Sequence, residues 1–224
     1  MKQLAAHAAF IRAQTVLALP PLVPEVRLYL ASEVTPLWEA TEVTLAASHV
    51  PPPYWAFAWP GGQALARHLL DRPELARGRI VLDFAAGSGI AAIAAARAGA
   101  ARVLASEIDP AACAAIRLNA ALNGAEVEIF AADLTQSADC AAELILAGDV
   151  CYERGMAEGA ISWLRLQARL GATVLLADPG RAYRPQDGLE ELAHYRVPTS
   201  RDLEDSEERR AVVWRLEAAA APAG

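Results

Sequence analysis

The stretch of sequence that decides the fold is Ile80-Val81-Leu82-Asp83-Phe84-Ala85-Ala86-Gly87-Ser88-Gly89. Its apolar start predicts a short buried strand, and its two glycines predict a tight turn. The Ala-rich residues 90–98 that follow predict a helix, which Gly99 ends. A strand that runs through a glycine-rich turn into a helix is typical of the first βα unit of nucleotide-binding α/β folds.

The same alternation of strands and helices continues along the chain. We expect strands at residues 80–82, 103–105, 127–130, 144–146 and 173–177, and helices at residues 90–98, 109–123 and 155–170. Strands separated by helices predict parallel pairing with right-handed crossovers. Residues 194–198 and 211–216 have no helix between them, which predicts an antiparallel hairpin at the edge of the sheet. The expected fold class is therefore α/β, with a doubly wound, mostly parallel, seven-stranded sheet.

The first 70 residues depart from this alternation. We expect residues 1–70 to form an extension that packs on the domain of residues 71–224, within a single structural domain. Apolar residues at helical spacing predict a helix near the N-terminus, which the prolines after residue 19 end. Further expected elements are a strand at residues 25–30, a helical turn at residues 35–40 and a helix that follows Pro60-Gly61-Gly62 and ends near residue 71.

The composition limits the classes of partner. The 224 residues are 54% apolar, which is enough for a sizeable core, and the formal net charge of −7 argues against a nucleic-acid-binding surface. Cys113, Cys140 and Cys151 lack disulfide or zinc spacing, so we expect no metal. No apolar run reaches the about 20 residues of a membrane span, so we expect no membrane association. Because the cysteines suit a reducing compartment, we predict a cytoplasmic bacterial protein, or a mitochondrial-matrix protein in a eukaryotic cell.

The carboxylate of Asp83 distinguishes two kinds of ligand. Residues 87–92 match the pattern G-x-G-x-x-A, which alone suggests a dinucleotide site. A carboxylate at the end of the strand would repel a dianionic pyrophosphate, whereas S-adenosylmethionine presents a cationic ammonium and a cationic sulfonium to such a turn. Asp83 therefore favours S-adenosylmethionine over NAD.

Two further acidic residues follow the next two expected strands. Glu107 lies 20 residues after Gly87 and is placed to accept hydrogen bonds from both ribose hydroxyls of a nucleoside. Asp133 is placed to accept a hydrogen bond from the adenine amino group. Asp109 directly precedes Pro110, and we interpret it as the N-cap of the next helix.

Five segments carry a resemblance to a known family. They are residues 53–65 (PYWAFAWPGGQAL), 83–89 (DFAAGSG), 149–153 (DVCYE), 178–181 (DPGR) and 198–204 (PTSRDLE). With these segments the chain resembles the seven-strand protein methyltransferases, and within them the electron transfer flavoprotein beta subunit lysine methyltransferases. The pieces Trp59-Pro60-Gly61-Gly62 and Asp149-x-x-Tyr152 are more specific than the glycine turn. Ala85 departs from the pattern, since it stands where many methyltransferases have the first glycine of the loop.

The resemblance implies transfer of a methyl group from S-adenosylmethionine, with S-adenosylhomocysteine as product, to a lysine of the flavoprotein beta subunit. Asp149 and Tyr152 would be the catalytic residues, beside the transferring methyl group. The implied substrate-binding residues are Tyr54, Trp55, Glu153, Thr199, Ser200 and Arg201. The implied cofactor-binding residues are Trp59, Gly61, Asp83, Phe84, Ala85, Gly87, Gly89, Glu107, Ile108, Asp133 and Leu134.

Other functions stay open at this point. A methyltransferase for a ribosomal protein or a small amine would use the same cofactor turn. A nicotinamide-dependent oxidoreductase would use the G-x-G-x-x-A pattern. A binding module without catalysis is disfavoured because Asp149 and Tyr152 are both present.

Some side chains have a simpler structural interpretation. The proline-flanked Trp55 and Trp59 fit a binding lip, whereas the three other tryptophans, Trp38, Trp163 and Trp214, are expected to pack in the core or at an edge. The charged residues 201–210 are most simply a solvated loop, and the resemblance also allows them to contact the protein substrate.

Overall fold

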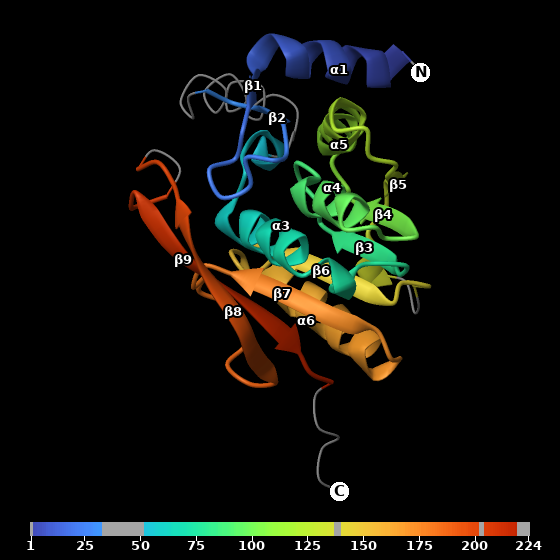
Figure 1. Ribbon diagram of the computed structural model, residues 1–224, viewed down its shortest axis with the longest axis vertical. Helices are drawn as coiled ribbons and strands as arrows, with labels where there is room; N and C mark the ends of the chain where they lie inside the picture. Colours follow the sequence, from blue (N-terminus) through green and yellow to red (C-terminus); the bar gives the residue numbers. More distant parts are fainter. Residues whose placement is uncertain (1, 33–51, 137–139, 202–203, 219–224) are drawn as a thin grey trace, which may run out of the picture.

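A computed structural model describes residues 2–32, 52–136, 140–201 and 204–218 of the chain. Within these ranges a central sheet has seven strands in the order β5-β4-β3-β6-β7-β9-β8 (Figure 1). The strands are β3 (Ile80–Phe84), β4 (Arg102–Ser106), β5 (Glu128–Phe130), β6 (Leu144–Gly148), β7 (Thr173–Asp178), β8 (Leu189–Pro198) and β9 (Glu208–Leu216).

The first five of these strands are parallel, and the last two are not. β9 pairs antiparallel with both β7 and β8, so the C-terminal hairpin places its second strand inside the sheet and its first strand at the edge. The predicted mostly parallel sheet with an antiparallel edge hairpin is therefore confirmed. β8 begins five residues before the expected residue 194, because the hairpin pairs continue past a β-bulge between Glu191 and Ala193.

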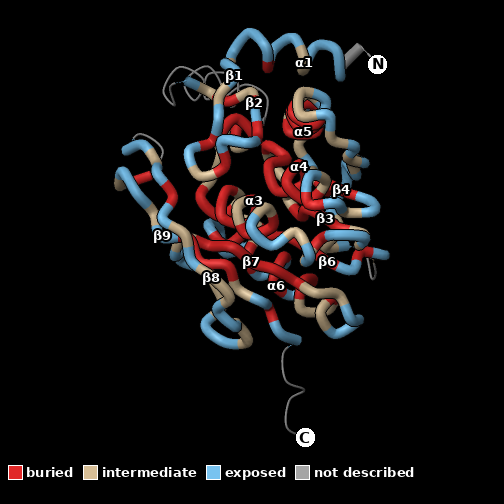
Figure 2. Tube along the Cα trace, in the orientation of Figure 1, coloured by how far each residue is buried: buried red, intermediate tan, exposed pale blue. Residues whose placement is uncertain are grey.

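Helices cover both faces of the sheet. α3 (Pro60–Asp71) and α4 (Ile90–Arg97) pack on one face, and α6 (Arg154–Arg169) packs on the other. α5 (Pro110–Leu122) packs against α4 and against the N-terminal elements (Figure 1). Figure 2 shows that buried residues are concentrated between these layers. Strands buried on both faces are typical of parallel sheets covered by helices, which explains why β3, β6 and β7 are apolar almost throughout.

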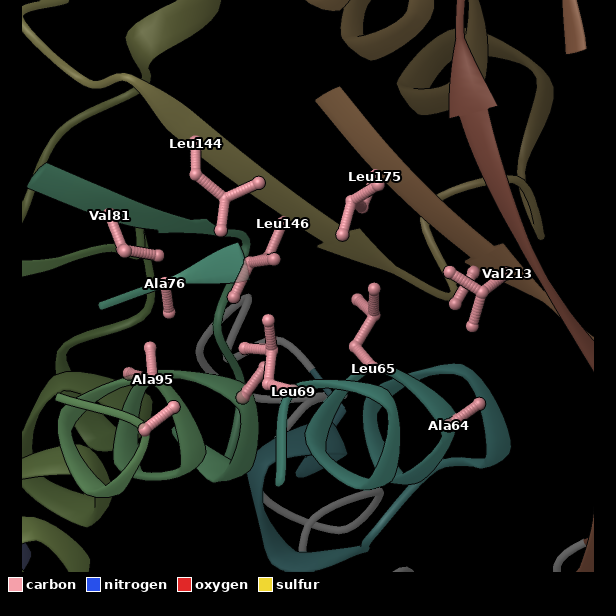
Figure 3. Packing of buried hydrophobic residues seen from close by; sticks show 14 of the residues in the cluster. Ala64, Leu65, Leu69, Ala76, Val81, Ala95, Leu144, Leu146, Leu175 and Val213 are labelled. Atoms are coloured by element: carbon pink, nitrogen blue, oxygen red, sulfur yellow. The ribbon is translucent and has the colours of Figure 1, made fainter. Parts of the chain in front are cut away.

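The larger apolar core lies between α3, α4 and the sheet. Leu65 and Leu69 of α3 point toward Leu146, Leu175 and Val213 of the strands, as Figure 3 shows. All five side chains have at most 1% of their surface exposed. This packing fixes α3 over the middle of the sheet and brings its N-terminus to the carboxyl ends of β6 and β7.

Local sequence signals account for the ends of two helices. Asp109 accepts a hydrogen bond from the backbone N–H of Ala111 at 2.8 Å, with Pro110 in the first helical position, so the predicted N-cap is confirmed. α3 begins at Pro60 and includes both glycines that were expected to precede the helix. Proline is well tolerated at a first helical position because no intrahelical partner is lost there.

The N-terminal part differs from expectation in two places. The first helix, α1 (Lys2–Gln14), ends well before the prolines, because residues Val16–Ala18 form β1 and pair with β2 (Leu28–Leu30). The prediction that the prolines end this helix was therefore wrong. Of the strand expected at residues 25–30, only residues 28–30 form a strand, because Val26 donates its backbone N–H to the carbonyl of Val23 in a turn. The helical turn expected at residues 35–40, with Trp38, lies outside the described residues.

The described residues also contain three short 3-10 helices: η1 (Tyr54–Ala56), η2 (Pro73–Leu75) and η3 (Leu134–Gln136). The division of the chain at residue 70 stays a prediction. Across the ranges that the structure describes, no helix combines the length and the apolar character needed to cross a bilayer.

Candidate active site

The carboxyl ends of three neighbouring parallel strands bring three carboxylates to one edge of the sheet. Asp83 lies in β3, Glu107 directly follows β4, and Asp149 directly follows β6. Ligands of open α/β sheets bind in the crevice beyond these strand ends. The parallel pairing of β4, β3 and β6 therefore brings Asp83, Glu107 and Asp149 to the same edge of the sheet.

The turn after β3 requires left-handed backbone at three positions. Ala85 has φ 52°, Gly87 has φ 52° and Gly89 has φ 78°. A side chain added at Gly89 would also come within 3.2 Å of Ile116, so the close packing of α5 excludes one there. At Gly87 such an atom would meet open space, which leaves the tip of the turn accessible to a ligand. Alanine at position 85 adopts a conformation that glycine adopts without steric cost, which explains why many methyltransferases have glycine there.

Asp83 is buried beneath this turn, with 3% of its surface exposed. Its Oδ2 accepts a hydrogen bond at 2.9 Å from the backbone N–H of Ala92 in the first turn of α4. Burial raises the pKa of Asp83 to about 8, opposed by this hydrogen bond and reinforced by the nearby Glu107. In dinucleotide sites the helix N-terminus binds the pyrophosphate. Here the protein's own carboxylate occupies that position, which favours a cationic ligand.

Glu107 joins the turn to the end of β4. Its Oε2 accepts from the backbone N–H of Gly87 at 3.0 Å, and its Oε1 accepts from those of Ile108 at 2.8 Å and Asp109 at 3.1 Å. Burial raises the pKa of Glu107, against the effect of these hydrogen bonds. The side chain of Ile108 is 72% exposed beside it. Carboxylate acceptors next to an apolar side chain suit a ribose and an adenine ring, so the residues fit the nucleoside of S-adenosylmethionine.

Three other residues that were expected to bind the cofactor, Phe84, Asp133 and Leu134, differ in their exposure. Asp133 is exposed and accepts hydrogen bonds from Thr135, from the backbone N–H at 2.9 Å and the hydroxyl at 2.6 Å, which lower its pKa. Leu134 is half-buried against the core on the α6 side of the sheet. The ring of Phe84 stacks on Trp163 with centroids 5.1 Å apart in the same core. Phe84 therefore offers a ligand its backbone at most, and the expected core position of Trp163 is confirmed.

Asp149 holds the start of α3 against the end of β6. Its backbone is left-handed, with φ 55°, and its side chain is 9% exposed. Oδ2 accepts from the backbone N–H of Gly61 at 2.5 Å and of Gly62 at 3.2 Å, and Oδ1 accepts from Nη2 of Arg181 at 3.1 Å. Burial raises the pKa of Asp149 to about 6, and the positive charge of Arg181 opposes that rise.

Three aromatic side chains come from the segments that precede α3 and follow Asp149. The ring of Tyr54 lies 5.3 Å from that of Tyr152 and 5.9 Å from that of Trp59, centroid to centroid. Tyr152 is 38% exposed, and burial of its remaining surface raises its pKa to about 12, which keeps the phenol neutral at physiological pH. Trp59 donates its indole N–H to the carbonyl of Tyr54 at 2.8 Å and carries the guanidinium of Arg181 over its ring.

Trp55 is more deeply buried than Tyr152. Only 3% of its surface is exposed, and it belongs to a cluster with Ile11 and the alanines of α5. This burial favours packing over the substrate contact that was expected for Trp55. Tyr54, one residue earlier, is the side chain of this segment that reaches Tyr152.

Comparison with known proteins identifies the family of this chain. A model of the ribosomal protein L11 methyltransferase family (PrmA) matches residues 64–151. The electron transfer flavoprotein beta subunit lysine methyltransferase of Xenopus laevis is 39% identical over 215 residues, covering 93% of this chain and 86% of the relative. The chain belongs to the electron transfer flavoprotein beta subunit lysine methyltransferase family. The resemblance drawn from the five sequence segments is thereby confirmed.

Another member of this family and two solved methyltransferase structures are also similar to this chain. The family member of Danio rerio is 42% identical over 171 residues, and the match covers 74% of this chain and 66% of that relative, just under two thirds. A proposed RNA methyltransferase of Pyrococcus horikoshii has a TM-score of 0.53 at 15% identity, over 78% of this chain and 96% of that one. Magnesium protoporphyrin IX methyltransferase of Synechocystis, with bound S-adenosylmethionine, has a TM-score of 0.50 at 18% identity, over 67% of this chain and 77% of that one. These two structures show the shared fold.

The remaining expected substrate residues of this family member lie on two loops. Thr199 closes the β8–β9 loop, with its hydroxyl donating to the carbonyl of Ser206 at 2.6 Å. Ser200 and Arg201 are exposed on that loop, and Arg201 forms an ion pair with Glu207 at 3.2 Å. Glu153 is exposed just before α6. Among the described residues, no group of three His, Cys, Asp or Glu side chains is arranged to hold a metal.

Two charged residues of the family member were missed as site residues. Arg181 bonds to Asp149, and Glu204 bonds to Arg181. Glu204 is 5% exposed, so the interpretation of residues 201–210 as a solvated loop is wrong at this position. Its burial follows from pairing with Arg181 and Arg209. Both residues fall in sequence segments that carry the family resemblance, and that was the one signal available for them.

The contact between Asp149 and α3 leads to a prediction on stability. A Cβ at position 61 would lie 2.5 Å from both the carbonyl oxygen of Ala177 and Oδ2 of Asp149. We expect Gly61→Ala to lower the free energy of unfolding by about 1–3 kcal/mol, since the buried atoms must move apart. Denaturant unfolding measures this change.

A matched control lies in α6. A Cβ at Gly159 would meet nothing within 4 Å, so Gly159→Ala should leave stability unchanged or raise it by up to about 1 kcal/mol through helix propensity. Equal unfolding midpoints for the two variants would contradict the close contact at Gly61.

Proposed function

We propose that the protein is an S-adenosylmethionine-dependent protein-lysine N-methyltransferase that acts on the electron transfer flavoprotein beta subunit. The observation that carries the proposal is the relationship to the frog enzyme over nearly the whole chain, not only over the cofactor half. The site supports it with acceptors for a cationic nucleoside, with the buried carboxylate of Asp149 and with the paired rings of Tyr54 and Tyr152, which follows Asp149 by three residues.

The cofactor would be held by residues at the ends of β3, β4 and β5. Asp83 would attract its positive charge, Glu107 would accept the ribose hydroxyls, and Asp133 would accept the adenine amino group. When bound, S-adenosylmethionine supplies a methyl group whose bond to sulfur breaks, with the electron pair staying on sulfur, as the bond to the lysine nitrogen forms. The backbone of Gly87 and the side chain of Ile108 leave room for this ligand on the open side of the turn.

Asp149 and the tyrosines would prepare the lysine. A lysine ammonium has a pKa of about 10.4, and it has no lone pair for attack until it loses a proton. The Asp149 carboxylate would attract the ammonium and then orient the neutral amine through an N–H hydrogen bond, while the proton leaves to water. Tyr54 and Tyr152 would offer their aromatic faces to the methylated, cationic product.

Methyl transfer to defined proteins tests the proposal. The purified protein is incubated with S-adenosylmethionine labelled in the methyl group and with electron transfer flavoprotein beta subunit, ribosomal protein L11 or a small amine. We expect label on the flavoprotein subunit, with intact-mass steps of one, two or three methyl groups that report the multiplicity. Label on L11 or on the amine, without label on the flavoprotein subunit, would overturn the proposed substrate.

Methylation of ribosomal protein L11 is the second candidate. The matching family model favours it, but the match ends at residue 151 and so covers the cofactor half of the domain. It leaves out the β8–β9 hairpin with its loop of exposed polar residues. The match therefore supports a shared cofactor site more than a shared protein substrate.

A further inference from the structure

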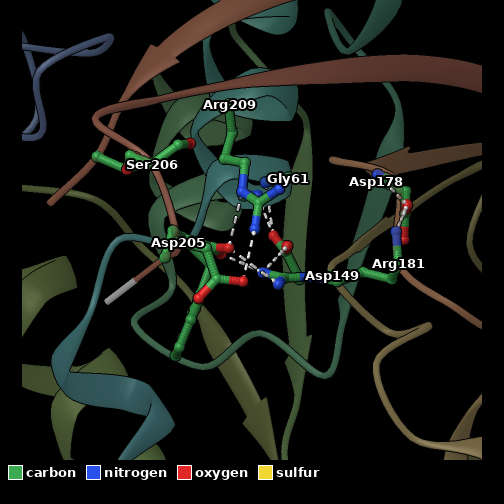
Figure 4. A network of polar contacts seen from close by, with 12 residues as sticks. Gly61, Asp149, Asp178, Arg181, Asp205, Ser206 and Arg209 are labelled. Atoms are coloured by element: carbon green, nitrogen blue, oxygen red, sulfur yellow. Dashed lines mark hydrogen bonds and ion pairs between the residues drawn. The ribbon is translucent and has the colours of Figure 1, made fainter. Parts of the chain in front are cut away.

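A network of two buried carboxylates and two half-buried arginines connects the β8–β9 loop to Asp149. It consists of Asp149, Arg181, Glu204 and Arg209, and we call it the Arg181 network. Figure 4 shows Arg181, Arg209 and Asp149 converging beside Gly61. Both terminal nitrogens of Arg181 bond to Glu204, Nη1 to Oε2 at 3.1 Å and Nη2 to Oε1 in a very short contact. Arg209 donates its Nε to Oε2 of Glu204 at 3.1 Å.

The burial of Glu204 distinguishes it from its neighbours on the same loop. The side chain of Glu204 is 2% exposed, whereas those of Arg201, Asp205 and Glu207 are at least 75% exposed. A carboxylate loses much hydration free energy on burial, and a buried ion pair often adds little to net stability. Stability alone is therefore a weak reason for the ion pair between Glu204 and Arg181. A second reason is that this pair positions a side chain.

The pair positions the guanidinium of Arg181 relative to Asp149. Arg181 is shared: Glu204 receives two hydrogen bonds from it, and Asp149 receives one, on Oδ1. A carboxylate has about four acceptor positions, of which Asp149 uses three, with Gly61, Gly62 and Arg181 as donors. One position on Oδ1 is left for another donor. A guanidinium released from Glu204 has further N–H groups to donate. Because Oδ2 already accepts two hydrogen bonds, a second bond from Arg181 to Asp149 would fall on Oδ1 and close this position.

We propose that Glu204 is a positioning residue for methyl transfer, which holds Arg181 in a single contact with Asp149 so that Oδ1 keeps one acceptor position for the substrate amine. The inference rests on the proposed function, in which Asp149 orients that amine. Glu204 also offsets the positive charge of Arg181, so that the Asp149 carboxylate keeps its attraction for an ammonium. The β8–β9 loop thereby acts on the reaction through Arg181.

Several charged groups face Asp149 from the surrounding elements. Arg181 lies on the loop after β7, Asp178 lies at the end of β7, and Glu204 and Arg209 belong to the hairpin. The neighbouring Cys151 thiol has its pKa raised to about 12, by burial first and then by Asp178 and Asp149, and stays neutral. When Glu204 loses its charge, Arg181 acts on Asp149 alone. The pKa of the Asp149 carboxyl should then fall.

The variant Glu204→Gln tests the inference, with Asp205→Asn as a matched control. Both changes replace one acid by its amide on the same loop, and Asp205 is fully exposed. We expect Glu204→Gln to lower kcat on the flavoprotein subunit about tenfold through misplacement of the amine, with unchanged affinity for S-adenosylhomocysteine by calorimetry. The control should match the unmodified protein in both measurements.

Glu204→Gln also leaves two arginines facing one buried carboxylate, which threatens folding. The double variant Glu204→Gln with Arg209→Gln restores the balance of charge and should fold, yet its kcat should remain low because Arg181 is still released. Arg209→Gln alone should keep most of the activity. Full activity of the folded double variant would overturn the inference.

A measurement without substrate separates the inference from the proposed function. The pKa of Asp149 is followed by carboxyl-carbon NMR, with the signal assigned by its loss in Asp149→Asn. It should be lower in Glu204→Gln than in Asp205→Asn. An equal pKa in the two variants would refute the role of Glu204, whichever protein is methylated. A lack of transfer by the unmodified protein, together with the expected difference in pKa, would refute the proposed substrate and leave the positioning role supported.

Discussion

Asp149→Asn is expected to lower kcat by about 100-fold or more, the effect of misplacing a reacting group by about 1 Å. The asparagine keeps an acceptor for Gly61 and Gly62, but its amide group presents N–H donors toward Arg181 and carries no charge to attract an ammonium. The lysine amine would lose both its attraction and its orientation. Because Asp83 and Glu107 are untouched, the affinity for S-adenosylhomocysteine should change little.

Steady-state kinetics with the flavoprotein subunit and calorimetry with S-adenosylhomocysteine measure these two quantities separately. Thermal unfolding checks that the variant remains folded, since Asp149 also connects β6 to α3. Asp187→Asn serves as a control, because Asp187 pairs with Arg165 at the surface, away from the strand ends. Turnover that survives in a folded Asp149→Asn protein would remove Asp149 from the reaction.

Asp83→Asn is expected to weaken the binding of S-adenosylmethionine by about 10- to 150-fold, since a hydrogen bond to a charged group contributes about 1.5–3 kcal/mol. The asparagine oxygen still accepts from the N–H of Ala92, so the start of α4 should be preserved. What disappears is the carboxyl group that ionises when the cation binds. Calorimetry of both proteins with S-adenosylmethionine measures the loss, and equal affinities would contradict a charge-based site.

The same residue makes binding depend on pH. In the free protein Asp83 keeps its proton up to about pH 8, and a cation favours the ionised form, so binding below that pH releases a proton. Affinity should therefore rise with pH and level off above about 8. The amino group of the cofactor titrates nearby, at about 7.7–8.0. The difference between the unmodified protein and Asp83→Asn, measured in buffers of different ionisation enthalpy, isolates the contribution of Asp83.

Burial of Asp83 also affects stability without cofactor. The unfolded chain loses this proton near pH 3.9, whereas the folded protein keeps it to about pH 8. Between these values the folded state binds more protons, so this contribution to stability falls as pH rises and is lost once pH passes the folded pKa. Asp83→Asn should lack this slope in thermal unfolding measured across the same range.

The sequence carried enough local information to predict the sheet and the acidic strand ends. β3, β6 and β7 are short apolar runs. Gly99 follows the end of α4, and Asp109-Pro110 marks the start of α5. Glu107 follows its strand directly, so its position at the sheet edge follows from parallel pairing alone. Side-chain direction is less local. Trp55 and Phe84 lie in motifs of the family, yet their rings turn into the core, because neighbouring helices supply apolar partners there.

The Arg181 network could not be predicted from local pattern. Glu204 stands in a run of charges, which is typical of an exposed loop, and its burial depends on Arg181, which lies 23 residues earlier in the chain. The predicted end of the first helix was too late in the chain for a related reason. Val16 has a strand partner in Leu30, and pairing across fourteen residues overrode the helical spacing of the segment.

Because β9 lies between β7 and β8, this side of the sheet can form only after β9 has been synthesised. β8 is synthesised before β9, and β9 is its one strand partner among the residues that the structure describes, so β8 has no such neighbour until residues 208–216 have left the ribosome. Until then the open side of β7 is exposed as well. A nascent chain halted before residue 208 would carry two unpaired strand edges, which are templates for aggregation. The pairing of β9 with both β7 and β8 therefore removes these edges in a single step.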